Sequence, residues 1–174
     1  NDILYRFFTT GRYEEGQVKP SFAPSMDIQA ASNFERFLYF MLGKDSGKVR
    51  EVMARMKAGE VVDFGGIESG FSASRMSDAE IPGVIERLWR ESGYVADPHT
   101  ACAFTDMAAD RVSVVLATAS PAKFPEVVAQ ATGHEPTHAT LEALKEKPLE
   151  RHPLPADVAA VKAFLDSTLP SRVS

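Results

Sequence analysis

The sequence predicts a helix-rich α/β chain with few strands of its own. Apolar residues recur at helical spacing along much of the chain, most clearly over Phe34–Leu42. One run, Ser113–Ala117, has instead the β-branched character of a strand that is buried on both faces. Glycines and capping residues separate these segments, as expected of short helices joined by tight turns.

The helical segments are bounded by residues that favour helix ends. Gly11, Gly43, Gly59, Gly93 and Gly133 each follow an apolar-periodic stretch, where a left-handed residue commonly ends a helix. The predicted helices are Ile3–Thr9, Phe34–Leu42, Lys48–Ala58, Val84–Ser92, Ala101–Ala108, 121–132, Thr140–Lys145 and Ala156–Thr168.

Local capping signals support two of these helix starts. Ser77 and Glu80 have the spacing of a capping box, in which the carboxylate reaches back to the serine. Ser120 is followed by Pro121, which suits the first position of a helix. Pro82 leaves open whether a helix starts before it or at it.

The predicted strand Ser113–Ala117 lacks obvious neighbours. A strand that is buried on both faces needs pairing partners at both edges. The sequence offers only weak candidates for strands, near Val18 and Val61. We therefore expect the neighbouring strands to lie in sequence outside these 174 residues.

Composition excludes several classes of function. The 174 residues are 44% hydrophobic and 25% charged, which is typical of a globular domain. The net charge of -5, without any run of Lys or Arg, argues against nucleic-acid binding. The longest apolar runs, such as Phe37–Leu42, are too short to span a membrane. Cys102 is the single cysteine, so no intrachain disulfide can form.

The junction Thr118–Ser120 is the place most suited to a ligand. In open α/β sheets, ligands bind beyond the carboxyl ends of strands and beside helix N-termini, where free N–H groups are available. The alternative is that Thr118 and Ser120 only satisfy backbone groups in a tight turn. The residues by themselves favour the tight turn, since helix caps are common and ligand sites are few.

Other residues of chemical interest have simpler explanations. His134 and His138 have the spacing of a helical metal pair, but Gly133 and Pro136 oppose a helix there, so we predict no metal site. Lys123 could reach an anion or could be a solvated surface residue. Cys102 has no evident base nearby and is interpreted as a small core residue.

Several motifs resemble those of threonine synthases of the bacterial and fungal type. The stretch Leu116–Phe124 resembles the family's T-A-H-P-A-K-F, and Asp97–Ala101 matches its D-P-H-T-A. Ser25–Ile28 and Ala31–Arg36 match its S-M-D-I and S-N-F-E-R segments, and Asn1–Leu4 resembles a helix start after its phosphate-binding loop. The motifs occur in the family's order and together span nearly the whole chain, which is interpreted as a C-terminal portion.

The resemblance implies a fold, a reaction and a cofactor. The fold is that of the tryptophan-synthase-β-like, fold-type-II pyridoxal-phosphate enzymes. The reaction is the conversion of O-phospho-L-homoserine and water to L-threonine and phosphate, with pyridoxal 5'-phosphate (PLP) as the electron sink. Thr118 matches the family's threonine that faces the pyridine nitrogen of the cofactor. Ser120 stands where the family usually has histidine, which puts any role of that histidine in doubt.

The remaining parts of the site are expected outside this chain. The family's Schiff-base lysine and phosphate loop have no counterpart in it, so we predict no catalytic residue in these 174 residues and no activity of the chain alone. The expected partners are the missing N-terminal part of the same enzyme and the substrate O-phospho-L-homoserine, in the cytoplasm, with no nucleic acid and no membrane. An alternative is a non-catalytic, helix-rich interaction module derived from the same family.

The expected organisation has two parts. A strand–helix unit at residues 112–132 would belong to the cofactor-binding domain, and residues 134–174 would form a C-terminal helical tail.

Overall fold

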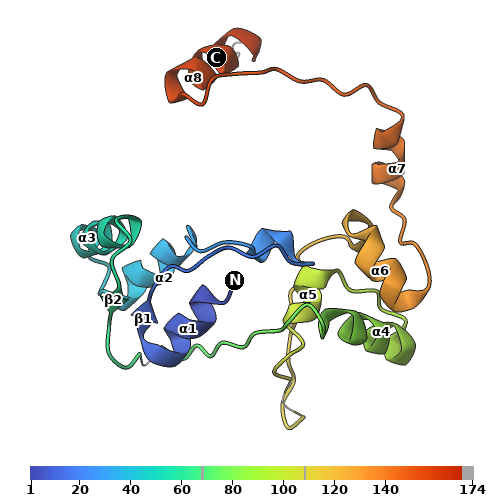
Figure 1. Cartoon of the computed structure of the whole chain (residues 1–174), viewed down its shortest axis with the longest axis horizontal. Coiled ribbons are helices and arrows are strands. Elements are labelled where there is room, and N and C mark those ends of the chain that lie inside the picture. Colours follow the sequence, from blue (N-terminus) through green and yellow to red (C-terminus); the bar gives the residue numbers. More distant parts are fainter. Residues whose placement is uncertain (68, 108, 170–174) are drawn as a thin grey trace. The chain divides into compact units, whose positions relative to one another are not determined.

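In the computed structural model the chain is built mainly of helices (Figure 1). The structure describes residues 1–67, 69–107 and 109–169. These residues form two compact units, Asn1–His138 and Ala139–Ser174. The helices are α1 (Ile3–Thr10), α2 (Phe34–Met41), α3 (Ser46–Lys57), α4 (Ile81–Ser92), α5 (Pro98–Cys102), α6 (Pro125–Thr132), α7 (Ala139–Lys145) and α8 (Val158–Thr168), with short 3-10 turns η1 (Pro24–Met26) and η2 (Pro121–Lys123).

An aromatic core organises the first half of the larger unit. Phe7 on α1 is fully buried and its ring contacts five other aromatic rings at centroid distances of 4.6–6.5 Å, mostly edge to face. Phe34 and Leu38 on α2 and Val49 and Met56 on α3 complete this core. The helical periodicity of Phe34–Leu42 is thereby confirmed as a packing face.

Strands β1 (Arg12–Tyr13) and β2 (Val62–Asp63) pair antiparallel, Tyr13 with Val62, beside this core. Gly11 allows the pairing to form, because its φ of +77° is left-handed and a Cβ there would meet the Gly65 carbonyl oxygen at 1.7 Å. The predicted weak strand near Val61 lies next to β2, whereas Val18 lies in a segment without regular structure.

A second core lies among α4, α5 and α6. Ile81, Ile85, Ala101, Val127 and Val128 pack together there and are almost completely buried. Because α5 is short, it relies on the neighbouring helices α4 and α6 for its apolar contacts. This core therefore fixes the positions of the residues that precede and follow α5.

The helix ends follow the sequence closely, with corrections at α5 and α6. Gly93 and Gly133 adopt left-handed conformations at the ends of α4 and α6, as predicted. The helix predicted at Ala101–Ala108 is wrong: α5 is Pro98–Cys102, because the Asp97 side chain caps it. Ala108 lies outside the described residues. Pro121 begins the short turn η2, and the α-helix itself starts only at Pro125.

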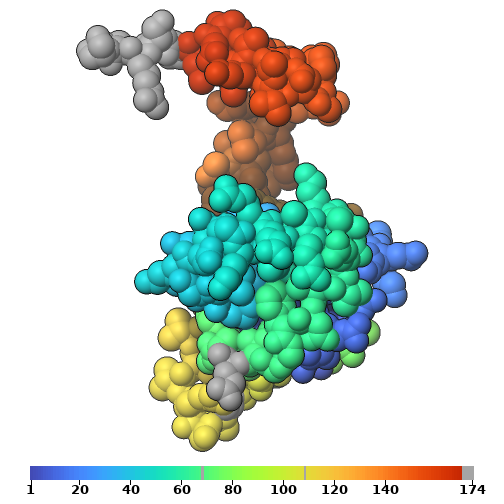
Figure 2. All heavy atoms as spheres, turned by 90° about the vertical axis from the view of Figure 1, so that its left-hand side faces the viewer, coloured from blue at the N-terminus to red at the C-terminus, as the bar shows by residue number. Residues whose placement is uncertain are grey.

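The predicted strand Ser113–Ala117 is not a strand in this chain. Residues 112–118 have no regular secondary structure, and Val112, Val114 and Leu116 are 94%, 84% and 75% exposed. The prediction of burial on both faces is therefore wrong for these 174 residues. Figure 2 shows this segment in yellow at the surface of its unit. Within the described residues β1 and β2 pair only with each other, and this segment pairs with neither of them.

The second unit contains α7 and α8. Asp157 caps α8 by accepting a hydrogen bond from the Ala160 backbone N–H. On this helix the apolar side chains of Val158, Val161 and Leu165 are 40–85% exposed. Across the described ranges of both units, no helix is long and apolar enough to cross a membrane.

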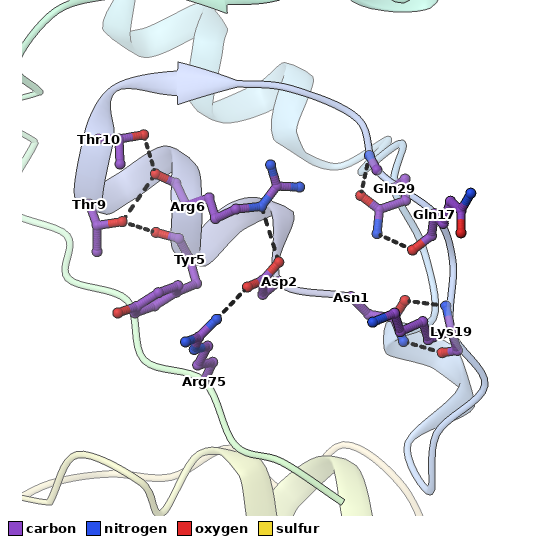
Figure 3. A network of polar contacts seen from close by, with 11 residues as sticks. Asn1, Asp2, Tyr5, Arg6, Thr9, Thr10, Gln17, Lys19, Gln29 and Arg75 are labelled. Carbon is purple, nitrogen blue, oxygen red and sulfur yellow. Dashed lines mark hydrogen bonds and ion pairs between the residues drawn. The ribbon is translucent and has the colours of Figure 1, made fainter.

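A polar network holds the start of α1, as shown in Figure 3. Asp2 accepts hydrogen bonds from Arg6 at 3.1 Å and from Arg75 at 2.7 Å. The Asn1 amide pairs with both backbone groups of Lys19. Burial acts to raise the pKa of the Asp2 carboxyl, but the hydrogen bonds from Arg75 and Arg6 outweigh it and hold this pKa below its ordinary value of 3.8.

We expect Asp2→Asn to lower the free energy of unfolding of the chain at neutral pH and to lower it less in acid. The pKa of Asp2 is lower in the folded state than its ordinary value of 3.8. The ionised carboxylate therefore stabilises the fold fully above pH 3.8, and this stabilisation is lost as the pH falls through the pKa of the folded state. Urea unfolding of both proteins at neutral pH and well below pH 3.8 measures this difference. A cost that stays constant with pH would contradict the ionic contribution of Asp2.

Candidate functional site

The predicted ligand site at Thr118 lies beside the N-terminal end of α5. The backbone N–H of Thr118 donates a hydrogen bond of 3.1 Å to the Thr100 hydroxyl oxygen on α5. This bond anchors one end of residues 112–118, whose other members make no hydrogen bond within the described chain. Ser120 accepts a long hydrogen bond of 3.4 Å from the Ala122 N–H and so begins η2, which confirms its predicted role as a cap.

Thr100 is tied in turn to the buried carboxylate of Asp97. Asp97 is 1% exposed, and its Oδ2 accepts the hydroxyl proton of Thr100. Its Oδ1 accepts the backbone N–H groups of His99 at 2.9 Å and Thr100 at 3.4 Å. A carboxylate buried to this extent needs such donors, since desolvation without hydrogen bonds is costly.

His99 connects the same carboxylate to residues far away in the sequence. Its Nδ1 lies 2.9 Å from Asp97 Oδ1, and its Nε2 accepts the backbone N–H of Ser25 at 3.1 Å. Because Nε2 accepts from Ser25, the proton on Nδ1 is the one that the ring donates to Asp97. The His99 ring also lies against Phe124, at a centroid distance of 4.8 Å.

Three segments singled out in the sequence therefore meet in one hydrogen-bonded network. They are the stretch beginning at Ser25, the stretch Asp97–Ala101 and the stretch around Thr118. Sequence reasoning assigned no role to Asp97, His99 and Thr100. One signal for them was present in the sequence. An aspartate followed directly by proline is typical of a helix start, and it indicates that Asp97 caps a helix that begins at Pro98.

The Thr118 side chain remains available to a ligand. Thr118 is exposed, and no described residue forms a hydrogen bond with its hydroxyl. A neutral hydroxyl in this position can donate to a ring nitrogen or accept from a polar group. Two open cavities, of about 860 Å³ beside Asn1 and Arg6 and about 550 Å³ between α2 and α3, do not include Thr118.

In the described part of the chain, the other candidate residues of the sequence, Cys102, Lys123 and the histidines His134 and His138, make no side-chain hydrogen bond to Asp97, His99, Thr100 or Thr118. Cys102 donates to the Pro98 carbonyl at 3.3 Å, and burial raises the pKa of its thiol, with Asp78 and Asp97 adding to the shift. This disfavours the reactive thiolate. Lys123 is exposed, and residues 134–138 are not helical, as predicted. Within the described ranges no cluster of three or more His, Cys, Asp or Glu side chains could hold a metal ion.

Comparison with known proteins decides the family. Residues 99–165 match the family model described as threonine synthase, C-terminal. The chain is 35% identical to the threonine synthase of Methylobacillus glycogenes and 37% identical to that of Pseudomonas aeruginosa. Each alignment covers 95% of this chain and 38% of the relative.

The chain belongs to the threonine synthase family. It spans well under half the length of the relatives that it matches. The motif resemblance noted in the sequence is therefore confirmed, including the correspondence to a C-terminal portion.

The fold of this threonine synthase portion also matches solved structures. The structure of a PLP-bound threonine synthase from Brucella melitensis superposes with a TM-score of 0.75 and 34% identity, over 95% of this chain and 38% of the other. The yeast threonine synthase gives a TM-score of 0.70 at 27% identity, over 95% of this chain and 40% of the other. The prediction of a helix-rich piece of this fold, with few strands of its own, is confirmed.

Proposed function

We propose that this chain is part of a threonine synthase that converts O-phospho-L-homoserine and water to L-threonine and phosphate. The observation that carries the proposal is the network in which Ser25, the Asp97–Thr100 cap and Thr118 meet, because these residues come from three motif segments of the family. The family membership supports the same conclusion. We place the complete enzyme in the cytoplasm.

The residues present fit PLP as the cofactor of the complete enzyme. PLP, when bound, supplies an electron sink for negative charge that develops on substrate carbon atoms. Thr118 has an exposed hydroxyl with no partner among the described residues, and its backbone is anchored by Thr100. We assign Thr118 as the contact to the pyridine nitrogen. A hydroxyl can donate there without requiring that the nitrogen be protonated.

The rest of the enzyme is the expected partner of this chain. It would supply the lysine that binds PLP and the loop that holds the cofactor phosphate. We further propose that residues 112–118 pair as a strand with strands of that part. Their backbone has the unpaired donors and acceptors that a strand uses, and Val112, Val114 and Leu116 are exposed apolar side chains that such pairing would cover.

Thr118→Val in the full-length enzyme is expected to lower turnover about tenfold while PLP retention changes little. One lost hydrogen bond to a polar ring atom is worth up to about 1.4 kcal/mol, which is a factor of ten in rate, whereas the phosphate loop holds the cofactor. Phosphate release measures turnover, and PLP absorbance after dialysis measures retention. Thr118→Ser, which keeps the hydroxyl, serves as the control and should stay near wild type. Equal turnover of Thr118→Val and wild type would contradict the assigned contact.

A further inference from the structure

The hydroxyl of Thr100 has a fixed hydrogen-bond direction. Its single proton is donated to Asp97 Oδ2, so towards Thr118 the oxygen can act only as an acceptor. The Thr118 N–H donates to this oxygen at 3.1 Å. Thr100 is 2% exposed, which leaves little access for water to replace either bond.

Asp97 in turn cannot easily shift, because four donors converge on its carboxylate. Two are the backbone N–H groups of the α5 first turn, and two are the His99 ring and the Thr100 hydroxyl. The second core packs against the same helix through Ala101. Thr100 Oγ1 is therefore held in place by a well-packed and hydrogen-bonded part of the unit.

Thr118, by contrast, ends a segment that is otherwise without hydrogen bonds in the described chain. Among residues 112–118 it alone makes a hydrogen bond within the described chain. The bond uses its backbone N–H and leaves its side chain exposed. Within the described chain, the Thr100 side chain is thus the one hydrogen-bond partner that holds the Thr118 backbone in place.

We propose that Thr100 is a positioning residue, which holds the Thr118 backbone so that the Thr118 hydroxyl faces the cofactor ring nitrogen. This inference rests on the proposed function, because it takes Thr118 as the ring-nitrogen contact. Thr100 itself touches neither cofactor nor substrate in this assignment. It acts through the single hydrogen bond that it accepts from Thr118.

The chain contains a matched control for Thr100. Thr132 is also a buried threonine, 7% exposed, whose hydroxyl lies within donating distance of the Val128 and His134 carbonyl oxygens, at 2.9 and 3.0 Å, and accepts the His134 N–H at 3.2 Å. Like Thr100→Val, Thr132→Val removes a buried hydroxyl that both donates and accepts hydrogen bonds, here with backbone groups at the C-terminal end of α6. A general loss of stability would affect both variants, whereas a loss of positioning would affect Thr100→Val alone.

The test uses the full-length enzyme reconstituted with PLP that carries ¹⁵N in its ring. The ¹⁵N NMR shift of that nitrogen reports its hydrogen bonding directly, independently of turnover. We expect Thr100→Val to move the signal in the same direction as Thr118→Val, by at least about half as much. Thr100→Ser, which keeps the acceptor, should restore it, and Thr132→Val should leave it unchanged.

Turnover adds a second criterion. If Thr100 acts through Thr118, the double variant Thr100→Val/Thr118→Val should turn over within about twofold of Thr118→Val alone, since coupled residues are not additive. Two outcomes would overturn the positioning role and leave the proposed function standing. One is a double variant in which the two losses of turnover multiply, and the other is a ring nitrogen signal that Thr118→Val moves and Thr100→Val does not. A ring signal unmoved by Thr118→Val would instead overturn the Thr118 contact itself.

The wild-type enzyme provides a test that needs no variant to fold. A Thr118 amide that donates to a buried oxygen should exchange with deuterium about ten times more slowly than a free amide, or slower still. Rapid exchange at this amide would overturn the positioning role even if Thr100→Val did not accumulate as folded protein.

Discussion

Asp97→Ala is expected to lower the free energy of unfolding of the chain by about 3–5 kcal/mol. The substitution removes a carboxylate that is 1% exposed and that accepts hydrogen bonds from four donors. Each buried donor left without a partner costs about 1–3 kcal/mol, and less where water can enter the space left behind. It also removes the cap of α5. Urea unfolding followed by circular dichroism measures the loss.

Asp45→Ala is the matched control for this prediction. Asp45 also caps a helix, accepting the Gly47 and Lys48 N–H groups at 2.9 and 3.1 Å, but it is exposed to solvent. Water can satisfy the donors that its loss would free, so its removal should lower the free energy of unfolding much less than the removal of Asp97. Equal costs for the two substitutions would contradict the central place given to the buried carboxylate of Asp97.

Local signals predicted the helices well, because they depend on residues close in sequence. Gly93 and Gly133 adopt the left-handed conformation that ends a helix. Glu80 reaches back to both the N–H and the hydroxyl of Ser77, as the capping-box spacing indicated. Such features need no tertiary information, since a helix end is determined within one turn.

The strand at Ser113–Ala117 could not be predicted in the same way. Its β-branched composition indicates what the segment would be when paired, but pairing depends on a neighbour. In the described chain that neighbour is absent, and the same residues lack regular structure and are mostly exposed. The segment is unpaired within the described residues, and the expectation that its partners lie in other sequence stays a prediction, whereas the expectation of burial is wrong for this chain.

The candidate site was predicted only in part. Thr118 came from a family motif, and its anchor on Thr100 comes from a contact between residues 18 positions apart. The bond between Ser25 and His99 spans 74 positions. Sequence spacing cannot reveal such contacts, because they arise from the packing of α5 against its neighbours.

The chain alone is expected to be inactive, which is the largest of the expected effects. Thr118 is the single residue that we assign to the cofactor, and a hydroxyl at the ring nitrogen tunes PLP but does not anchor it. The covalent lysine and the phosphate loop would come from the remainder of the enzyme. Residues 112–118 would also gain their strand partners only in that assembly.

The most direct test is phosphate release from O-phospho-L-homoserine in the presence of PLP. The 174-residue chain should release no more phosphate than a control without protein, and the full-length enzyme should release phosphate together with threonine in equal amounts. Release by the chain alone above the control would contradict the claim that it is one part of a larger site. A full-length enzyme that forms no threonine from this substrate would contradict the proposed function itself.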